Sequence, residues 1–535
     1  MRGHEKGRKG SGGITAESVW KEYEKGLAFK AQIGLFDTVR VNENFFIGKQ
    51  WEGVASNGLP TPVFNFLKRL VLFTVSSITS NSVKLQASLI REKGAPAKVR
   101  ALVDAVNAEF ERLFERNDIL ALTREMMRNT AVDGDGCLYT YWDTELETGG
   151  MTRGGIVTEV IENTRVFFGN VNDRRVEKQP YIILSRREMA DALRERARLY
   201  GCEGWETIRS DTDDNGSDTA RMVDDKATVL IRFWRNRETR TIWACETAKG
   251  VLLRAPWDTG LRRYPITWIN WDYVTDCYHG QAMLTGLIPN QIFINKLYAM
   301  SMISLMTTAY PKVVYDRTRI AKWDNRVGAA IPVAGGDMSS VARIIDPAQI
   351  SPQIAQFIQM AVRETQANHG ATSVALGEAR PENTSAITAL QKASAVPSEL
   401  TRHNLYRCLE DLGRIYLDFM GEYYGVHIPD GGTIDEAVDF SMLGNVGVSL
   451  RLDVGASSYW SEIAAVQTLD NLMAAGKIDM ADYLERLPEG YIARKQELLD
   501  KVQARTEMGA EAPAQKAARP DTKDALIALG QFALS

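Results

Sequence analysis

The spacing of apolar and polar positions predicts two long helices in the middle of the chain. The first covers residues 289–308. Pro289 stands at its first position, where the missing proline N–H is not needed. The second covers residues 352–369, and Gly370 after it is a suitable residue to end a helix. The apolar face of the second helix consists of Ile354, Phe357, Ile358, Ala361, Val362 and Thr365.

A third helical pattern is longer still. It covers residues 385–424 and is interrupted only by Pro397. At about 1.5 Å per residue, such a helix is on the order of 60 Å long. That length exceeds what one compact core can bury, so the pattern indicates a strut in a larger assembly. We expect the helix to kink at Pro397, because proline removes one hydrogen bond and clashes with the preceding turn. Beyond the kink, Leu405, Leu409, Leu412, Tyr416 and Phe419 are expected to pack inward.

The first half of the chain is predicted to be α+β. Apolar positions with helical spacing predict helices at residues 16–36, 62–80, 96–115, 119–130 and 187–200. Runs of β-branched and aromatic residues predict strands at residues 83–91, 137–142, 154–168, 181–185, 227–234, 239–245, 251–254 and 264–271. Residues 42–53, NENFFIGKQWEG, are expected to form a compact aromatic turn segment, and a small satellite core is favoured there over a ligand site.

Short strands are also predicted in the second half. Residues 313–315, 330–333 and 341–345 indicate a small β excursion between the first two long helices. Residues 438–443 and 446–454 are predicted to pair as a hairpin around Gly444 and Asn445. Residues 457–502 are predicted to be helical again.

Composition and charge exclude some classes of protein. Of the 535 residues, 44% are hydrophobic and 25% are charged, which is ordinary for a soluble globular protein. The net charge of −4 argues against a tight, non-specific nucleic-acid binder. Five widely separated cysteines without a CxxC pair fit a reducing compartment. The basic, glycine-rich N-terminus has no apolar segment, so no signal peptide is expected, and polar residues within 287–310 argue against a membrane span.

A search for catalytic motifs favours no enzyme. The chain has no GxxxxGK[ST] phosphate loop, no HExxH and no GxSxG. Asp133 and Asp135 invite a metal interpretation, but a DG-rich turn before a strand is favoured. The segment after Asp211 imitates the start of a calcium loop, yet Met222 replaces the twelfth-position glutamate, so a surface loop is favoured. We therefore expect no catalytic residue, no cofactor and no metal.

Four stretches give the chain a wider resemblance. They are NENFFIGKQWEG with the following NFLKRLVLFTVSSITSN, the helix GLIPNQIFINKLYAMSM, the segment ALGEARPENTSAITALQKAS, and SSYWSEIAAVQTLDNLMAAGKIDMADYLERLP. In this order, and together with the order of elements, the chain resembles the portal proteins of tailed double-stranded DNA bacteriophages. The resemblance covers most of residues 16–502.

The resemblance implies a helix-rich α+β portal fold that assembles as a ring around a central channel. It assigns residues 1–14 to a disordered tail, 15–280 to the wing, 281–310 to a stem helix, 311–348 to the clip, 349–369 to a second stem helix, 370–384 to the tunnel loop, 385–428 to a long kinked helix, 429–456 to wing strands, 457–504 to the crown and 505–535 to a flexible C-terminal tail.

The resemblance also implies a function. Portals form closed rings of about twelve subunits at one capsid vertex of the virion, after assembly in the host cell cytoplasm. Double-stranded DNA passes through the ring during packaging and ejection. The implied partners are further copies of the chain, the terminase large subunit, a head–tail connector or adaptor protein, the major capsid and scaffolding proteins and the DNA, with no membrane.

Candidate site residues follow from this assignment. In the tunnel loop they are Gly370, Thr372, Ser373, Gly377, Glu378, Arg380 and Asn383. In the clip they are Lys312, Arg317, Arg319, Lys322 and Arg326, a locally basic set that suits an acidic partner, with a solvated rim as the alternative. Glutamine-rich stem helices suit the sliding of DNA, because each phosphate neutralised by Lys or Arg would add affinity.

Two other classes of protein remain as alternatives at this stage. A non-viral oligomeric scaffold built on long helices would explain the strut, but not the β excursion between two helices. A nucleic-acid enzyme could draw its carboxylates from distant strands without any local motif.

Overall fold

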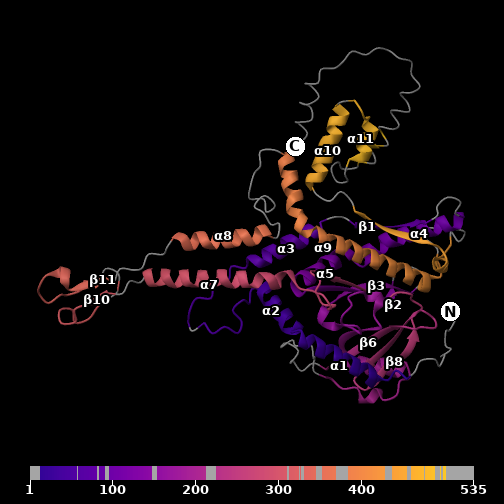
Figure 1. Ribbon diagram of the computed structural model, residues 1–535, viewed down its shortest axis with the longest axis horizontal. Helices are drawn as coiled ribbons and strands as arrows, with labels where there is room; N and C mark the ends of the chain where they lie inside the picture. The colour runs from indigo at the N-terminus through magenta and orange to yellow at the C-terminus, as the bar shows by residue number, and fades with distance from the viewer. Residues whose placement is uncertain are drawn as a thin grey trace, which may run out of the picture. The chain divides into compact units, whose positions relative to one another are not determined.

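The computed structural model describes residues 13–56, 58–80, 83–90, 96–147, 153–211, 225–309, 313–324, 326, 330–344, 352–368, 384–427, 437–454, 459–474, 476–487, 495, 498, 499 and 501. The chain divides into two compact units, Met1–Gly455 and Ala456–Ser535. Each unit is described by itself (Figure 1).

Three helices open the first unit. Helix α1 (Ala16–Gln32) begins at a reciprocal capping box between Thr15 and Ser18. Helix α2 (Leu35–Ile47) follows directly, so the predicted turn at residues 42–53 is wrong for its first half. Burial decides this: Phe45 and Phe46 enter the core from one face of α2. Helix α3 (Phe66–Ile78) begins after a loop that ends at a capping asparagine.

A three-stranded antiparallel sheet lies at the centre of the first unit. Helix α4 (Ala97–Arg116) and helix α5 (Ile119–Asp133) precede it. The strand order is β3 (Arg153–Ile161), β2 (Asp135–Glu147) and β9 (Ile266–Asn270). Gly134 joins α5 to β2 with a φ of +101°, a conformation that a side chain would strain. The first six residues of β2 are all buried, which makes it the central strand in packing as well as in order.

A second antiparallel sheet has five strands in sequence order. They are β4 (Val166–Phe168), β5 (Tyr181–Met189), β6 (Lys226–Arg235), β7 (Ile242–Ala248) and β8 (Val251–Asp258). Helix α1 lies along this sheet (Figure 1) and buries Val19, Trp20 and Tyr23 against Phe167 and Ile183. Helix α6 (Ala190–Leu199) covers a separate small cluster at one end of β8.

Three long helices and a small β pair complete the middle of the chain. They are α7 (Met283–Ala309), α8 (Pro352–Asn368), α9 (Thr384–Phe419) and the strands β10 (Val313–Tyr315) and β11 (Ala342–Ile344). A five-residue π-helix, Met420–Tyr424, extends α9. Residues 330–333 form no strand, so that part of the predicted β excursion is wrong.

The predicted hairpin around Gly444 and Asn445 is also wrong. Strand β13 (Val438–Asp439) pairs with β12 (Val426–His427), and β14 (Val448–Val454) pairs along its whole length with β1 (Val83–Leu89). A 3-10 turn at Phe440–Gly444 separates the two pairs. The turn residues Gly444 and Asn445 suggested a hairpin, but β14 pairs with β1, which lies more than 350 residues earlier in sequence. Leu85 and Ala87 of β1 are buried in this pair.

The second half of helix α9 is part of the main hydrophobic core of the first unit. The five residues predicted to pack inward are all buried, and Tyr416 also hydrogen-bonds Thr158 of β3 at 2.8 Å. Gly413 allows the helix to approach β1 and β14, because a Cβ there would lie 2.7 Å from Leu450 and 2.8 Å from Leu85. The predicted strut is therefore packed against strands β1 and β14 over its second half.

In the described part of the second unit, the residues 457–502 predicted to be helical include two helices. Helix α10 (Tyr459–Ala474) ends before Gly476, whose φ is +64°, and α11 (Met480–Arg486) starts at the capping residue Asp479. Leu469, Leu484 and Leu487 are buried.

Candidate DNA channel and docking surfaces

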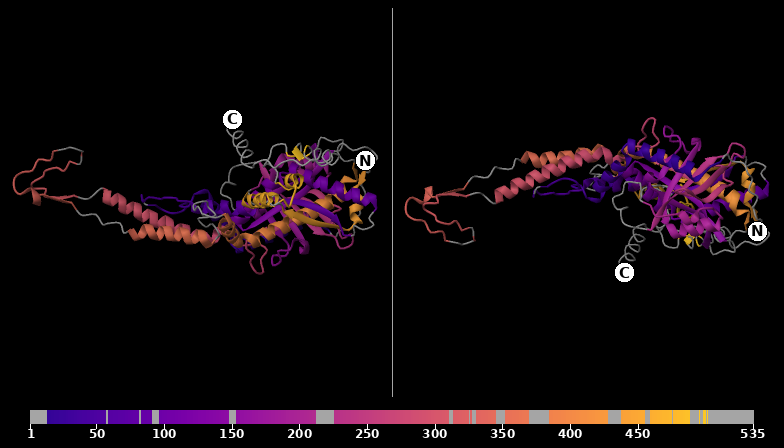
Figure 2. Two further views of the ribbon diagram at one scale, coloured as in Figure 1. Left: turned by 90° about the horizontal axis from the view of Figure 1, so that it is seen from above. Right: turned by 90° about the horizontal axis from the view of Figure 1, so that it is seen from below.

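The two helices predicted to form the stem, α7 and α8, lie side by side (Figures 1 and 2). Helix α7 begins at Met283, so the prediction that it begins at Pro289 is wrong. Met283, Leu284, Leu287 and Ile288 are buried, and their packing stabilises a turn and a half of helix ahead of the proline. The loss of one N–H donor at Pro289 does not end the helix.

Aromatic and polar contacts join the two stem helices. The rings of Phe293 and Phe357 meet edge to face, with centroids 6.1 Å apart. The side-chain amide of Asn290 donates to Thr365 Oγ1 at 3.2 Å, and Thr365 donates to the carbonyl of Ala361. Ile358 is buried, in line with the predicted apolar face of α8, but Phe357 on the same face is 51% exposed.

The stem carries very little charge. Across α7 and α8 the charged residues are Lys296, Arg363 and Glu364, which sum to +1. Exposed glutamines at positions 353, 356 and 359 present uncharged polar groups on α8. Since each cation that neutralises a phosphate adds salt-dependent affinity, these helices are suited to letting a polyanion pass and poorly suited to holding it.

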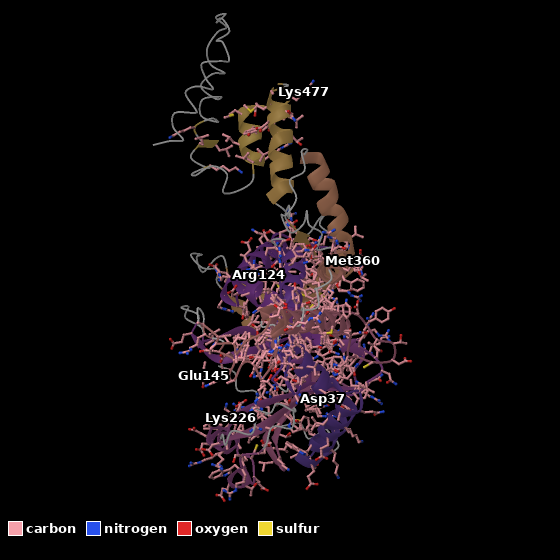
Figure 3. All side chains as sticks on the ribbon, turned by 90° about the vertical axis from the view of Figure 1, so that its left-hand side faces the viewer. Asp37, Arg124, Glu145, Lys226, Met360 and Lys477 are labelled. Atoms are coloured by element: carbon pink, nitrogen blue, oxygen red, sulfur yellow. The ribbon has the colours of Figure 1, made fainter. Side chains whose placement is uncertain are left out.

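Large apolar side chains remain exposed on the stem. On α7 and α8 they are Ile292, Phe293, Met300, Met302, Leu305, Met306, Phe357 and Met360, the last of which is labelled in Figure 3. Scattered exposed apolar residues are normal, but eight of them on two adjacent helices form a patch typical of a protein interface.

The predicted tunnel-loop residues lie outside the described residues. Gly370, Thr372, Ser373, Gly377, Glu378, Arg380 and Asn383 fall between the end of α8 at Asn368 and the start of α9 at Thr384. Their placement between the second stem helix and the long helix stays a prediction from the sequence.

The clip candidates are brought together only in part. Strands β10 and β11 pair antiparallel, and Ile320 and Val341 are buried beside them. Arg326 forms an ion pair with Asp324 at 2.6 Å, which lowers the pKa of that carboxyl. Arg319 donates to Ser340 Oγ at 3.1 Å and lies near Asp316.

Two of the five candidate docking cations are not paired with a neighbour. In the part of the clip that the structure describes, Arg317 and Lys322 are exposed and form no ion pair, whereas Lys312 lies outside the described residues. Of the five candidate docking cations, Arg319 and Arg326 are thus engaged by neighbours and Arg317 and Lys322 are not, while Lys312 stays a prediction from the sequence.

Helix α9 is assigned as one helix through Pro397. Its ribbon changes direction along its length in Figure 1. The position of the bend at Pro397 stays a prediction. Val396 and Leu400 on either side of the proline are 68% and 71% exposed, whereas Ser398 and Thr401 are buried, so one face of the helix is covered here and the other is open.

A buried polar cluster in the first unit was not anticipated from the sequence. The carboxylate of Asp135 accepts hydrogen bonds from the side-chain amides of Asn163 and Asn270, from Nδ1 of His279 at 2.6 Å and from the N–H of Gly280 at 2.7 Å. Burial lowers the pKa of His279, so its ring is neutral and donates from Nδ1. These donors come from separate chain segments, which is why no local motif revealed them.

A buried lysine borders the same cluster. Lys30 is fully buried and donates to the carbonyls of Asn163 and Thr164 at 2.8 Å each, with its ammonium over the ring of Phe167. Burial lowers the pKa of Lys30 well below its ordinary value. The cluster ties α1 to β2 and to the loop after β9.

The structure places the paired aspartates at the junction of α5 and β2. Asp135 is saturated by protein donors, and among the described residues no group of three or more His, Cys, Asp and Glu side chains could hold a metal ion. Asp211 is engaged as well, because its carboxylate accepts from Arg187 at 2.8 Å and from the N–H of Thr228 at 2.9 Å. The rest of the calcium-like segment lies outside the described residues.

These features define a class of protein before they define a family. A buried polar cluster that joins separate segments, and two weakly charged helices with exposed apolar side chains, are typical of a structural protein that works by assembly. Among the described residues, none of the helices is both long enough and apolar enough to cross a membrane.

The chain belongs to the phage P22-like portal protein family, whose model matches residues 104–427. No curated protein matches the chain. The family match covers 324 of the 535 residues and includes most of α4 and all of α5 to α9. It confirms the resemblance drawn from the sequence: the protein is a phage portal protein, a structural non-enzyme of the DNA-packaging channel. The non-viral scaffold and the nucleic-acid enzyme are both set aside by it.

Proposed function

We propose that the chain assembles into a closed ring of about twelve copies at one capsid vertex of the virion, with the stem helices around a central DNA channel. Membership of the portal family supports the channel, and the exposed apolar patch on α7 and α8 is the observation that carries the ring. A closed ring buries that patch against neighbouring copies, which is a cyclic heterologous arrangement.

Native mass spectrometry of the purified full chain tests the ring. We expect one dominant species of about twelve chains. Met300→Asp with Leu305→Asp should shift that species to monomers or small oligomers, because each change places a charge in an apolar interface. Leu199→Asp on α6 is the matched control, since Leu199 is 81% exposed on the wing and outside the stem. A parent chain that stays monomeric at micromolar concentration would contradict the proposal.

The proposal extends to partners of the clip. Arg317 and Lys322 would contact an acidic surface of the terminase large subunit during packaging and of a head–tail connector protein afterwards. In a pull-down with purified terminase, the double alanine variant should retain ring formation and lose binding, with a stronger loss at low salt. Arg124→Ala is the control, because Arg124 is an exposed cation on α5 (labelled in Figure 3). Equal capture by parent and variant would remove these two residues from the docking surface.

A further inference from the structure

The loop between α2 and α3 carries a second exposed apolar surface. This segment, residues 48–65, is called the arm, and all of it except residue 57 is described. Val54 and Leu59 are 54% and 55% exposed, and Val63 and Phe64 nearer its end are 40% and 51% exposed. Its ionisable residues are Lys49 and Glu52, so the arm is close to neutral.

Hydrogen bonds close the arm at its base. The indole N–H of Trp51 donates to the carbonyl of Pro62 at 2.9 Å and joins the two sides of the loop. The side-chain amide of Asn65 donates to the carbonyls of Phe45 and Phe46, which fixes the returning strand to the end of α2. Because these hydrogen bonds fix the base of the loop, its exposed apolar side chains are kept at the surface by the fold.

The same base is bound to the stem. Asn295 donates to Gln50 Oε1 at 2.6 Å, and Gln291 donates to the carbonyl of Phe64 at 2.9 Å. Gln291 and Asn295 are 0% and 3% exposed and hydrogen-bond each other, so this is a buried polar contact within α7. The ring of Phe64 stacks on Tyr298 of α7, with centroids 4.1 Å apart.

The arm and α8 lie on opposite flanks of α7. Figure 1 shows α8 on one side of α7 and the arm on the other, and both views of Figure 2 agree. Each flank ends in exposed apolar side chains: Val54 and Leu59 on the arm, and Phe357 and Met360 on α8. Two different apolar surfaces on opposite sides of one element are what a head-to-tail contact between identical chains requires.

We propose that the arm of one copy packs on the stem of the next copy in the ring, against the outward faces of α8 and α7. The inference rests on the proposed ring and names one surface within it. The arm would then couple neighbouring stems directly, because its base is fixed to α7 of its own chain by Gln291 and Asn295.

Photo-crosslinking in the assembled particle tests the contact. Leu59 is replaced by a benzophenone amino acid in a mixture of chains with natural and heavy nitrogen isotopes, so that crosslinks between copies carry both labels. We expect mixed-label crosslinks from position 59 to peptides of α7 or α8. The same probe at Leu199, which is 81% exposed on α6, is the control and should give no crosslink to the stem.

A milder variant keeps the test independent of the probe. Rings dissociate when the protein is diluted. In the Val54→Ser, Leu59→Ser variant they should dissociate at a subunit concentration about tenfold or more higher than in the parent, because apolar contacts at each interface are lost. Leu199→Ser should leave it unchanged. Rings that form normally but give crosslinks only within one chain, or to elements other than α7 and α8, would overturn the arm contact and leave the ring standing. A parent chain that forms no ring contradicts the proposed function itself.

Discussion

Asp135→Ala tests whether the buried cluster in the first unit stabilises the fold. Asp135 is 1% exposed, and its carboxylate accepts four hydrogen bonds. The amides of Asn163 and Asn270 each have a second acceptor, the carbonyls of Asp133 and Tyr278. Nδ1 of His279 and the N–H of Gly280 make no other hydrogen bond that the structure describes, so the variant leaves two buried donors unpaired.

The expected loss follows from those two donors. A buried donor left unpaired costs about 1–3 kcal/mol, so two of them should lower the free energy of unfolding by about 2–6 kcal/mol. Because the urea dependence of a unit this large exceeds the roughly 1–3 kcal/mol per molar of small proteins, the unfolding midpoint should fall by about 1 M. Asp135→Asn keeps one acceptor oxygen and should lose about half as much.

Urea unfolding followed by tryptophan fluorescence measures this loss. Ten of the eleven tryptophans precede residue 456, so the signal reports the first unit. Asp104→Ala is the control, because Asp104 is exposed on α4, and its midpoint should match that of the parent. A loss below about 1 kcal/mol for Asp135→Ala would mean that the donors find other partners, and the cluster would not be the tie between α1, β2 and the loop after β9.

Three further predictions concern other parts of the chain. Burial, with the charge of Glu43 next in importance, raises the pKa of Asp133 from its ordinary value of 3.8 to about 8, so between these two values the folded state binds more protons than the unfolded state. The stability that Asp133 contributes is therefore lost as the pH rises toward 8. In the parent, the urea midpoint should fall between pH 5 and pH 8, and in Asp133→Asn this fall should be smaller. An equal fall in the variant would refute the raised pKa of Asp133. Pro397→Ala should straighten α9, which electron cryomicroscopy of rings can measure as a smaller bend than in the parent, and an equal bend would show that the proline does not cause it. Deletion within residues 371–375 should leave rings intact but impair packaging or DNA retention, whereas Arg380→Ala should change them modestly, and a shortened loop that packages like the parent would place the loop outside the bore.

The sequence by itself determined where the long helices lie. Apolar periodicity placed the second stem helix, whose observed bounds are Pro352–Asn368, and the inward face of α9, whose five predicted residues are all buried. The order of elements and four short stretches were enough to indicate the family, which the match to residues 104–427 confirms. These features are encoded locally, because a helix repeats its buried face every three to four residues.

Tertiary structure alone decided the features that join distant segments. Strand β14 pairs with β1 instead of closing a hairpin, because β1 offers a full-length partner that no local pattern near Gly444 reveals. The start of α7 before Pro289 depends on the burial of Leu284 and Leu287 in the wing. The four donors to Asp135 come from segments up to 145 residues away, and only folding brings their hydrogen bonds to one carboxylate.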